Sequence, residues 1–551
     1  MIFKRKISTV GLLVGILFFA LSLTPSLLPR TNLMQGLISG LALTSGYAVG
    51  VLVRRVWFFF ELPLPKEGTQ RILTYVSGGL CLLTTVIFLW QATGWQNSLR
   101  AMMGLEETAV TRPMVILLAS TALFLILLML ARAIRWTFRR LSQWLHQYVP
   151  RRVSYTIGLL ATLTIFGLAA NGILFALILQ GADASYKQFD RQIQPDLDRP
   201  ADPMKSGSVV SLLNWNEMGR EGREFVVSAP DTGDLSKFTD LPVQQPIRVY
   251  AGMRAGNYEE RAELALRELQ RVNAFDRSIL IINTPTGSGW VDQAAIKPVE
   301  YLYRGDIATV SAQYSYLPSA LSLLFEGEYG QEMAQALFEK VYGYWSELPD
   351  EDRPRLYLQG LSLGALNSDR SFDLFDIIND PFSGALWSGP PYRSETWQHI
   401  NEQRDPDSPV WLPRFRDDSV VRFADRSGGL KNGNAEWGDF RIAYLQYASD
   451  PIVFFDPHSW FREPEWMQHP RGPGVNKNME WYPIVTTLQL VADMTLSTRS
   501  PVGYGHEYAA TDYLQSWVAL TEPPGWDSEE LDRLQAFFAE RDDRKTESKG
   551  L

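Results

Sequence analysis

The chain has 551 residues, more than one ordinary domain needs, and its charge is divided unevenly along its length. Residues 1–180 carry 16 Lys and Arg against 4 Asp and Glu, a net charge of +12; the remainder carries 36 against 57, a net charge of −21. An acidic main part argues against nucleic acid as a partner. The only cysteine, Cys81, lies in the basic part, so the acidic part needs no disulfide and has no cysteine nucleophile or cysteine zinc site.

Five apolar stretches follow one another in the first third of the chain. They cover residues 7–28, 33–60, 72–91, 114–131 and 155–179. Each is close to the ~20 residues that a helix needs to cross the hydrocarbon core of a bilayer. The first lacks a convincing small-residue cleavage site and is followed at once by the second, which favours a retained span over a secretory signal. Residues 1–180 are therefore predicted to form a membrane domain of about five transmembrane helices.

Basic residues gather in alternate loops between these stretches. They lie before the first span, between the second and third, and between the fourth and fifth. By the positive-inside rule these loops are cytoplasmic. We therefore expect a multi-pass protein of the cell (inner or plasma) membrane, with a cytoplasmic N-terminus, an extracytoplasmic C-terminal domain and the lipid bilayer as a partner. Few ionisable residues lie in the spans, which argues against a transport pathway.

The remaining chain divides into three parts. Residues 181–240 are rich in Asp, Pro, Gly and Ser and are predicted to be a juxtamembrane connector with one strand at 208–213. Strand and helix patterns then alternate through a predicted catalytic domain at 241–525, and 526–551 is a charged C-terminal tail. Strands are expected at 247–250, 278–283, 308–313, 355–359, 384–387 and 442–447, with helices at 258–272, 291–303, 331–345 and 509–520. This alternation predicts a mostly parallel sheet with helices on both faces.

A Gly-x-Ser-x-Gly pattern, Gly360-Leu-Ser-Leu-Gly364, stands between the strand at 355–359 and a stretch that opens a helix. A serine on such a sharp turn has a strained backbone, and flanking glycines remove side chains that would clash. Ser362 is therefore predicted to be a nucleophile; the alternative is a tight turn with an ordinary hydroxyl group.

A serine nucleophile needs a base, and a carboxylate must orient that base. His506 lies in the glycine-flanked loop Gly503-Tyr-Gly-His-Glu-Tyr508 before a predicted helix. Asp450 follows the strand at 442–447, at the carboxyl end where parallel sheets place function. Asp456 is a second candidate for the carboxylate, and a turn aspartate before proline is the structural alternative for Asp450.

An oxyanion hole requires two backbone donors. One is expected from Leu363, next to the nucleophile, and the other from Thr286 or Gly287, in the loop after the strand at 278–283. This loop is too short and wrongly composed for a phosphate-binding loop. We expect no cofactor and no metal.

A Pro-, Asp- and Arg-rich stretch at 388–441 contains Trp397, Trp411 and Trp437. It is interpreted as a cap insertion over the site whose tryptophans suit a lipid interface, and the alternative is a surface excursion.

Six motifs resemble the bacterial membrane-anchored α/β-hydrolases, a family long classed as a domain of unknown function. They are Thr286-Gly-Ser-Gly-Trp-Val-Asp292, Gln313-Tyr-Ser-Tyr-Leu-Pro-Ser319, Gly360-Leu-Ser-Leu-Gly364, Gly384-Ala-Leu-Trp-Ser-Gly-Pro-Pro391, Tyr447-Ala-Ser-Asp-Pro451 and Gly505-His-Glu-Tyr508. The family often has Glu where this chain has Leu361, a position that is not catalytic. The resemblance implies a multi-spanning N-terminal region followed by a hydrolase domain, and the order Ser362, Asp450, His506 is that of α/β-hydrolases.

Two classes of function follow. The first is a serine hydrolase, esterase- or lipase-like, or an acyltransferase, acting on a lipid-like or cell-envelope ester. The second is a non-catalytic envelope scaffold that keeps the fold. The set Ser362, Asp450 and His506 favours the enzyme.

Overall fold

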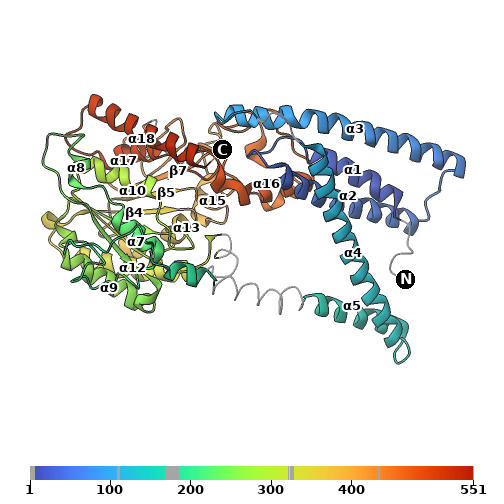
Figure 1. The fold of residues 1–551 in the computed structure, drawn as a ribbon, viewed down its shortest axis with the longest axis horizontal. Coiled ribbons are helices and arrows are strands. Elements are labelled where there is room, and N and C mark those ends of the chain that lie inside the picture. Colours follow the sequence, from blue (N-terminus) through green and yellow to red (C-terminus); the bar gives the residue numbers. More distant parts are fainter. Residues whose placement is uncertain are drawn as a thin grey trace. The chain divides into compact units, whose positions relative to one another are not determined.

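The computed structural model describes residues 7–107, 112–167, 185–319, 322, 328–431, 433 and 435–549. The chain forms two compact units (Figure 1). The helical unit comprises Met1–Gly181 and Phe455–Leu496, and the sheet unit comprises Ala182–Phe454 and Ser497–Leu551.

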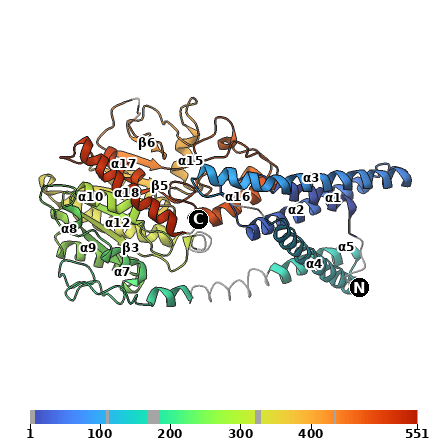
Figure 2. The same cartoon turned by 45° about the horizontal axis from the view of Figure 1, so that its top comes forward.

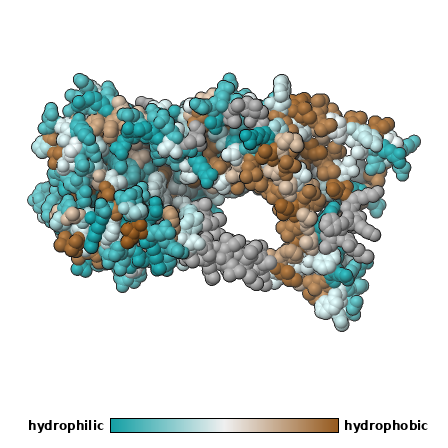
Figure 3. Space-filling model, viewed as in Figure 1, coloured by the Kyte–Doolittle hydropathy of each residue, from teal (hydrophilic) through white to brown (hydrophobic). Residues whose placement is uncertain are grey.

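The helical unit consists mainly of helices, and Figure 3 shows hydrophobic residues over much of its surface. Its N-terminal elements are α1 (Thr9–Leu21), α2 (Asn32–Phe59), α3 (Glu67–Met102), α4 (Pro113–Leu145) and α5 (Arg151–Gly167). Among the described residues, α2, α3 and α4 are long and apolar enough to cross a membrane.

The first and fifth predicted spans differ from the others. Helix α1 has 13 residues, so it spans about 20 Å, short of a hydrocarbon core of about 30 Å. The prediction of a first span over 7–28 was therefore too long, because Pro25 and Pro29 lie in the irregular chain that follows the helix. Helix α5 covers the beginning of the fifth predicted span, and residues 168–179 lie outside the described residues.

Helices α1 and α2 pack through glycines that lie four residues apart on each helix, Gly11 and Gly15 on α1 and Gly46 and Gly50 on α2. A Cβ atom on Gly46 would lie 2.7 Å from the carbonyl oxygen of Val14, and one on Gly15 would lie 2.8 Å from that of Leu43. This close approach of two backbones is the packing that small residues at such spacing permit in membrane helices.

The segment 455–496 belongs to the helical unit although it stands between two parts of the sheet unit. It contains η5 (Pro457–Trp460), η6 (Glu465–Met467) and α16 (Val485–Leu496). The Asp493 carboxylate on α16 accepts from Arg30 Nη2 at 2.9 Å, from Arg30 Nε at 3.1 Å and from the Leu27 N–H at 3.0 Å. Both charged side chains are buried, at 1% and 0% exposure. This buried ion pair attaches α16 to the loop between α1 and α2.

Seven strands form the sheet within the described part of the sheet unit, and all neighbouring pairs are parallel. Their order is β1-β3-β2-β4-β5-β7-β6. The strands are β1 (Ile247–Ala251), β2 (Ile279–Thr284), β3 (Ile307–Ala312), β4 (Arg355–Leu361), β5 (Gly384–Ser388), β6 (Val421–Ala424) and β7 (Arg441–Leu445). The predicted fold class is confirmed.

Helices cover both faces of this sheet (Figure 2). Helices α9 (Tyr258–Arg271), α12 (Tyr329–Glu347) and α13 (Leu363–Asp369) pack on one face, and α10 (Gln293–Leu302) and α17 (Ala510–Thr521) on the other. Among the described residues of the sheet unit, the other helical elements are α7 (Gly219–Val227), α8 (Thr232–Leu235), η2 (Met253–Ala255), η3 (Ala274–Asp276), η4 (Asp350–Asp352), α14 (Leu374–Ile377), α15 (Glu395–Glu402), η7 (Ser497–Arg499) and α18 (Ser528–Ser548).

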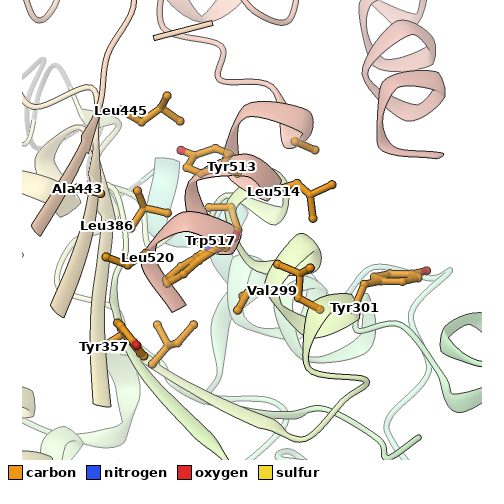
Figure 4. Packing of buried hydrophobic residues seen from close by; sticks show 14 of the residues in the cluster. Val299, Tyr301, Tyr357, Leu386, Ala443, Leu445, Tyr513, Leu514, Trp517 and Leu520 are labelled. Carbon is orange, nitrogen blue, oxygen red and sulfur yellow. Dashed lines mark hydrogen bonds between the residues drawn. The ribbon is translucent and has the colours of Figure 1, made fainter. Parts of the chain in front are cut away.

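The core between the sheet and α17 is centred on Trp517, which is fully buried. Figure 4 shows Trp517 and Leu520 of α17 among Tyr357, Leu386 and Val299. The indole N–H of Trp517 donates to the carbonyl of Ala295 at 2.7 Å, so this large side chain is buried without an unpaired donor.

Three sequence expectations differ from the structure. The predicted strand at 208–213 is wrong, because these residues form turns and bends. The short edge strand β6 was not predicted. The charged C-terminal stretch forms the helix α18, which has a capping box at Asp527 and Glu530 and buries Leu534 and Phe538.

Candidate active site

Ser362 lies at the turn between β4 and α13, in the middle of the sheet. Its φ of 58° and ψ of −120° are strained for a residue with a side chain. The N–H of Ser362 donates to the carbonyl of Ser388 at the end of β5 (2.9 Å), which holds the turn to the neighbouring strand. Ser362 is 5% exposed. The predicted serine therefore has the backbone of a nucleophile elbow.

The two glycines of the motif allow this turn for steric reasons. A Cβ atom on Gly360 would lie 2.3 Å from the carbonyl carbon of Gly364. One on Gly364 would lie 2.2 Å from the carbonyl oxygen of Thr284, at the end of β2. The second clash also shows that the elbow lies directly against the start of the β2–α10 loop, from which the second oxyanion donor was predicted.

The structure brings the predicted base and carboxylate together. Nδ1 of His506 lies 2.6 Å from Oδ2 of Asp450, and both side chains are buried. Oδ1 of Asp450 accepts the N–H of Ile452 at 2.8 Å, which fixes the carboxylate. Because Nδ1 bonds a carboxylate, it carries the proton in the neutral imidazole, and Nε2 is an acceptor.

The other imidazole nitrogen is buried and has no hydrogen-bond partner in the described part of the chain. A Cβ atom on Gly389 would lie 2.6 Å from Cε1 of His506, so the ring lies against the residue that follows Ser388. Ser388 in turn accepts the N–H of Ser362. The ring therefore lies beside the elbow with its acceptor unused, as a base awaiting the proton of a hydroxyl group would.

Tyr508 is a functional candidate that the sequence analysis missed. Its hydroxyl group donates to Oδ2 of Asp450 at 2.8 Å, the same oxygen that bonds His506. In the sequence, Tyr508 lies two residues after His506 in the motif Gly505-His-Glu-Tyr508. No spacing rule predicts from this that a tyrosine bonds the carboxylate.

The charges around His506 favour its protonated form. Burial opposes protonation, but the charge of Asp450 and the hydrogen bond to it, with Glu507 and Asp292, hold the pKa of His506 above its ordinary value. The Glu507 carboxylate is itself held by Lys545 at 3.1 Å and Lys549 at 3.0 Å. The surroundings thus stabilise the imidazolium that proton transfer from a serine would create.

The backbone N–H groups of the three predicted oxyanion donors differ in whether they can bind an oxyanion. Leu363 begins α13, and the first N–H groups of a helix have no acceptor within the helix. The N–H of Thr286 donates to the carbonyl of Trp290 at 3.0 Å, because the loop closes as a turn, so the assignment of Thr286 is not kept. The N–H of Gly287 donates to Oγ of Ser319 at 3.3 Å, a long bond that an oxyanion can replace.

Two family models match the chain. One, described as the alpha/beta-hydrolase family, matches residues 247–534, which is more than half of the chain. The chain belongs to this family. The second, described as the N-terminus of the alpha/beta-hydrolase family, matches residues 23–230. No curated protein and no solved structure gives a match.

The second candidate carboxylate of this α/β-hydrolase, Asp456, has a different environment. Its Oδ1 accepts the N–H of His458 at 2.7 Å and so caps η5. The ring of His458 lies 3.1 Å from the same oxygen but is 61% exposed. Asp456 and His458 belong to the helical unit, whereas Ser362, Asp450 and His506 share the sheet unit.

Two of the three tryptophans of the predicted cap, Trp397 and Trp437, are structural in the α/β-hydrolase. Trp397 and Trp437 are 7% and 8% exposed, and their indole N–H groups donate to Gln446 Oε1 at 2.7 Å and to the Val420 carbonyl at 3.0 Å. The carbonyl of Trp411 accepts from Gln446 at 3.1 Å. The stretch 388–441 supplies α15 and β6, and Trp397 and Trp437 are buried there with their indole N–H groups bonded. Their assignment to a lipid interface is therefore not kept.

No group of three or more His, Cys, Asp and Glu side chains that could hold a metal ion occurs among the described residues.

Proposed function

We propose that this α/β-hydrolase is a membrane-anchored serine hydrolase that cleaves an acyl ester through Ser362, His506 and Asp450. The observation that carries the proposal is a strained serine at the end of β4 together with a buried imidazole that lies against Gly389, the residue after the one that holds the Ser362 N–H. One nitrogen of that imidazole is bonded to Asp450, and the other is unused. A structural histidine in a core normally has both nitrogens satisfied.

The reaction follows from these contacts. Oγ of Ser362 forms a bond to the acyl carbon while its proton passes to Nε2 of His506. The oxyanion accepts hydrogen bonds from the N–H groups of Leu363 and Gly287. The bond to the leaving alcohol then breaks, and His506 returns the proton to the alcohol oxygen.

The acyl-enzyme that remains is resolved by the same groups. A water molecule gives a proton to His506 and attacks the acyl carbon; the bond to Ser362 then breaks, His506 returns the proton to Oγ of Ser362, and the acid is released. Asp450 keeps its charge throughout and stabilises the imidazolium.

The proposed setting is the extracytoplasmic face of the cell membrane. The arginines around the loop between α4 and α5 support a cytoplasmic position for that loop, and the predicted fifth span, 155–179, then leads to the extracytoplasmic side. A domain held at a bilayer meets lipid-like esters at high local concentration, which supports an ester of a lipid or envelope component as the substrate.

Covalent labelling of the full-length protein in detergent tests the chemistry. A fluorophosphonate probe should modify Ser362, as located by peptide mass, and Ser362→Ala should abolish labelling. Ser346→Ala is the matched control, since Ser346 lies on α12 and its hydroxyl group donates only to the carbonyl of Gly343 among the hydrogen bonds described. Labelling that persists in Ser362→Ala, or that the folded protein never shows, would contradict the proposal and favour a scaffold.

A further inference from the structure

A groove of about 900 Å³ opens in the helical unit between α2 and α4. Five arginines line it: Arg54 and Arg55 from α2, and Arg132, Arg135 and Arg139 from α4. The other lining side chains are apolar or neutral, and no acidic residue lines the groove in the described part of this unit. The groove is therefore a strongly cationic site on two helices that are apolar over most of their length.

The shape of the groove follows from how the two helices pack. Near their N-terminal ends they touch closely, because a Cβ atom on Gly36 would lie 2.7 Å from that of Ala119. The rings of Tyr47 and Phe124 meet edge to face at 5.4 Å. Beyond this pair α4 diverges from α2 toward the C-terminal ends, as Figure 1 shows. The space between the diverging ends is open to a ligand.

The arginines of α4 are spaced to act together. Arg132, Arg135 and Arg139 are three and four residues apart, so they lie along one face of the helix. On α2, the guanidinium of Arg54 lies 5.4 Å from the ring centre of Phe58. A planar guanidinium matches the oxygens of a phosphate group, and several of them on one site favour a phosphate over a carboxylate or a neutral ligand.

The walls of the groove decide which phosphate compound fits. Val51, Leu52, Leu127 and Leu128 line the groove beside the arginines. A free phosphate ion gains nothing from these apolar side chains, whereas the acyl chains of a phospholipid do. Basic pockets between membrane helices are a known kind of site for anionic lipid headgroups.

We propose that this groove binds an anionic phospholipid. The phosphate lies among Arg132, Arg135 and Arg139, and an acyl chain lies along the apolar walls toward Tyr47. This site is separate from the hydrolase site, since every residue that lines it belongs to the helical unit.

Native mass spectrometry of the full-length protein tests the site with two lipids, dioleoyl phosphatidylglycerol and dioleoyl phosphatidylcholine. The variant Arg132→Gln/Arg135→Gln should bind phosphatidylglycerol at least about tenfold more weakly than the parent. The control Arg140→Gln/Arg152→Gln removes the same charge outside the groove, and it should bind like the parent. Binding of phosphatidylcholine should be weak and unchanged throughout.

A second variant tests the apolar wall without altering charge. Ala131 lines the groove, and Ala131→Trp should fill it and also weaken phosphatidylglycerol binding. Equal loss in the groove and control variants would overturn the proposal in favour of general surface charge. Equal binding of the two lipids, an unchanged affinity in Ala131→Trp, or full competition by inorganic phosphate at the lipid's own concentration would each overturn it as well.

Discussion

Replacing Asp450 by Asn is the sharpest test of the proposed chemistry. In the parent protein Oδ2 of Asp450 accepts from both Nδ1 of His506 (2.6 Å) and the hydroxyl group of Tyr508 (2.8 Å). In the variant, Oδ1 keeps its bond from the Ile452 N–H, so the amide NH2 takes the place of Oδ2. The amide NH2 then faces two other hydrogen-bond donors, Nδ1–H of His506 and the hydroxyl group of Tyr508. The imidazole can accept from the amide only when its proton is on Nε2, so this tautomer is favoured.

The expected loss follows from this change of tautomer. An Nε2 that carries a proton cannot accept one from Ser362, so the turnover number should fall about 10⁴-fold, as in triads whose aspartate is replaced in this way. That factor corresponds to about 5 kcal/mol of transition-state stabilisation. The mismatched buried amide should also cost about 1–3 kcal/mol of stability.

The assay is hydrolysis of a short-chain p-nitrophenyl ester by the full-length protein in detergent, measured across pH. The parent needs neutral His506, whose pKa is raised above its ordinary value of 6.5. Parent activity should therefore be lost as pH falls through that raised pKa, with its midpoint above pH 6.5. In Asp450→Asn the charge that raises the pKa is gone, so the residual activity should persist to lower pH.

Asp456→Asn is the matched control, because this side chain caps η5 and is not bonded to His506. Its activity should stay within about twofold of the parent and its stability should change little, because Asn caps a helix about as well as Asp. The reasoning is refuted if Asp450→Asn keeps more than about a tenth of the parent activity while Ser362→Ala is inactive. It is also refuted if Asp456→Asn is the damaging change.

Three further predictions follow from single contacts or from the distribution of charge. Tyr508→Phe should lower kcat/KM about tenfold and move the loss of activity at low pH to a higher pH. Without the hydrogen bond from Tyr508, the charge of Asp450 acts more strongly on His506 and raises its pKa further. A shift to lower pH would contradict this role. Asp493→Asn should destabilise the helical unit by about 3–5 kcal/mol in thermal melts, because it leaves a buried guanidinium unpaired, and an unchanged melting temperature would contradict that estimate. A reporter that is active only outside the cytoplasm should give signal when fused at Leu551 and none at Ser142, and the opposite pattern would reverse the orientation.

The sequence by itself determined the elements that depend on local pattern. Alternating apolar strands and amphipathic helices predicted the parallel sheet, since side-chain periodicity reflects which face of each element is buried. Two glycines around Ser362 predicted the elbow, because the backbone at that turn excludes other side chains. The candidate Asp450 followed from its place after a predicted strand, and His506 from its glycine-flanked loop before a predicted helix.

Only the tertiary structure decided what depends on contacts between distant residues. The bond from Tyr508 to Asp450, the commitment of the Thr286 N–H to Trp290 and the burial of Trp397 and Trp437 have no periodic signature. The ion pair of Arg30 and Asp493 joins residues 463 apart in the chain. It places 455–496 with the helices of the helical unit, although Asp450 and His506 flank that segment in the sequence. Burial and charge pairing between distant residues determine this placement, and the local sequence pattern does not show it.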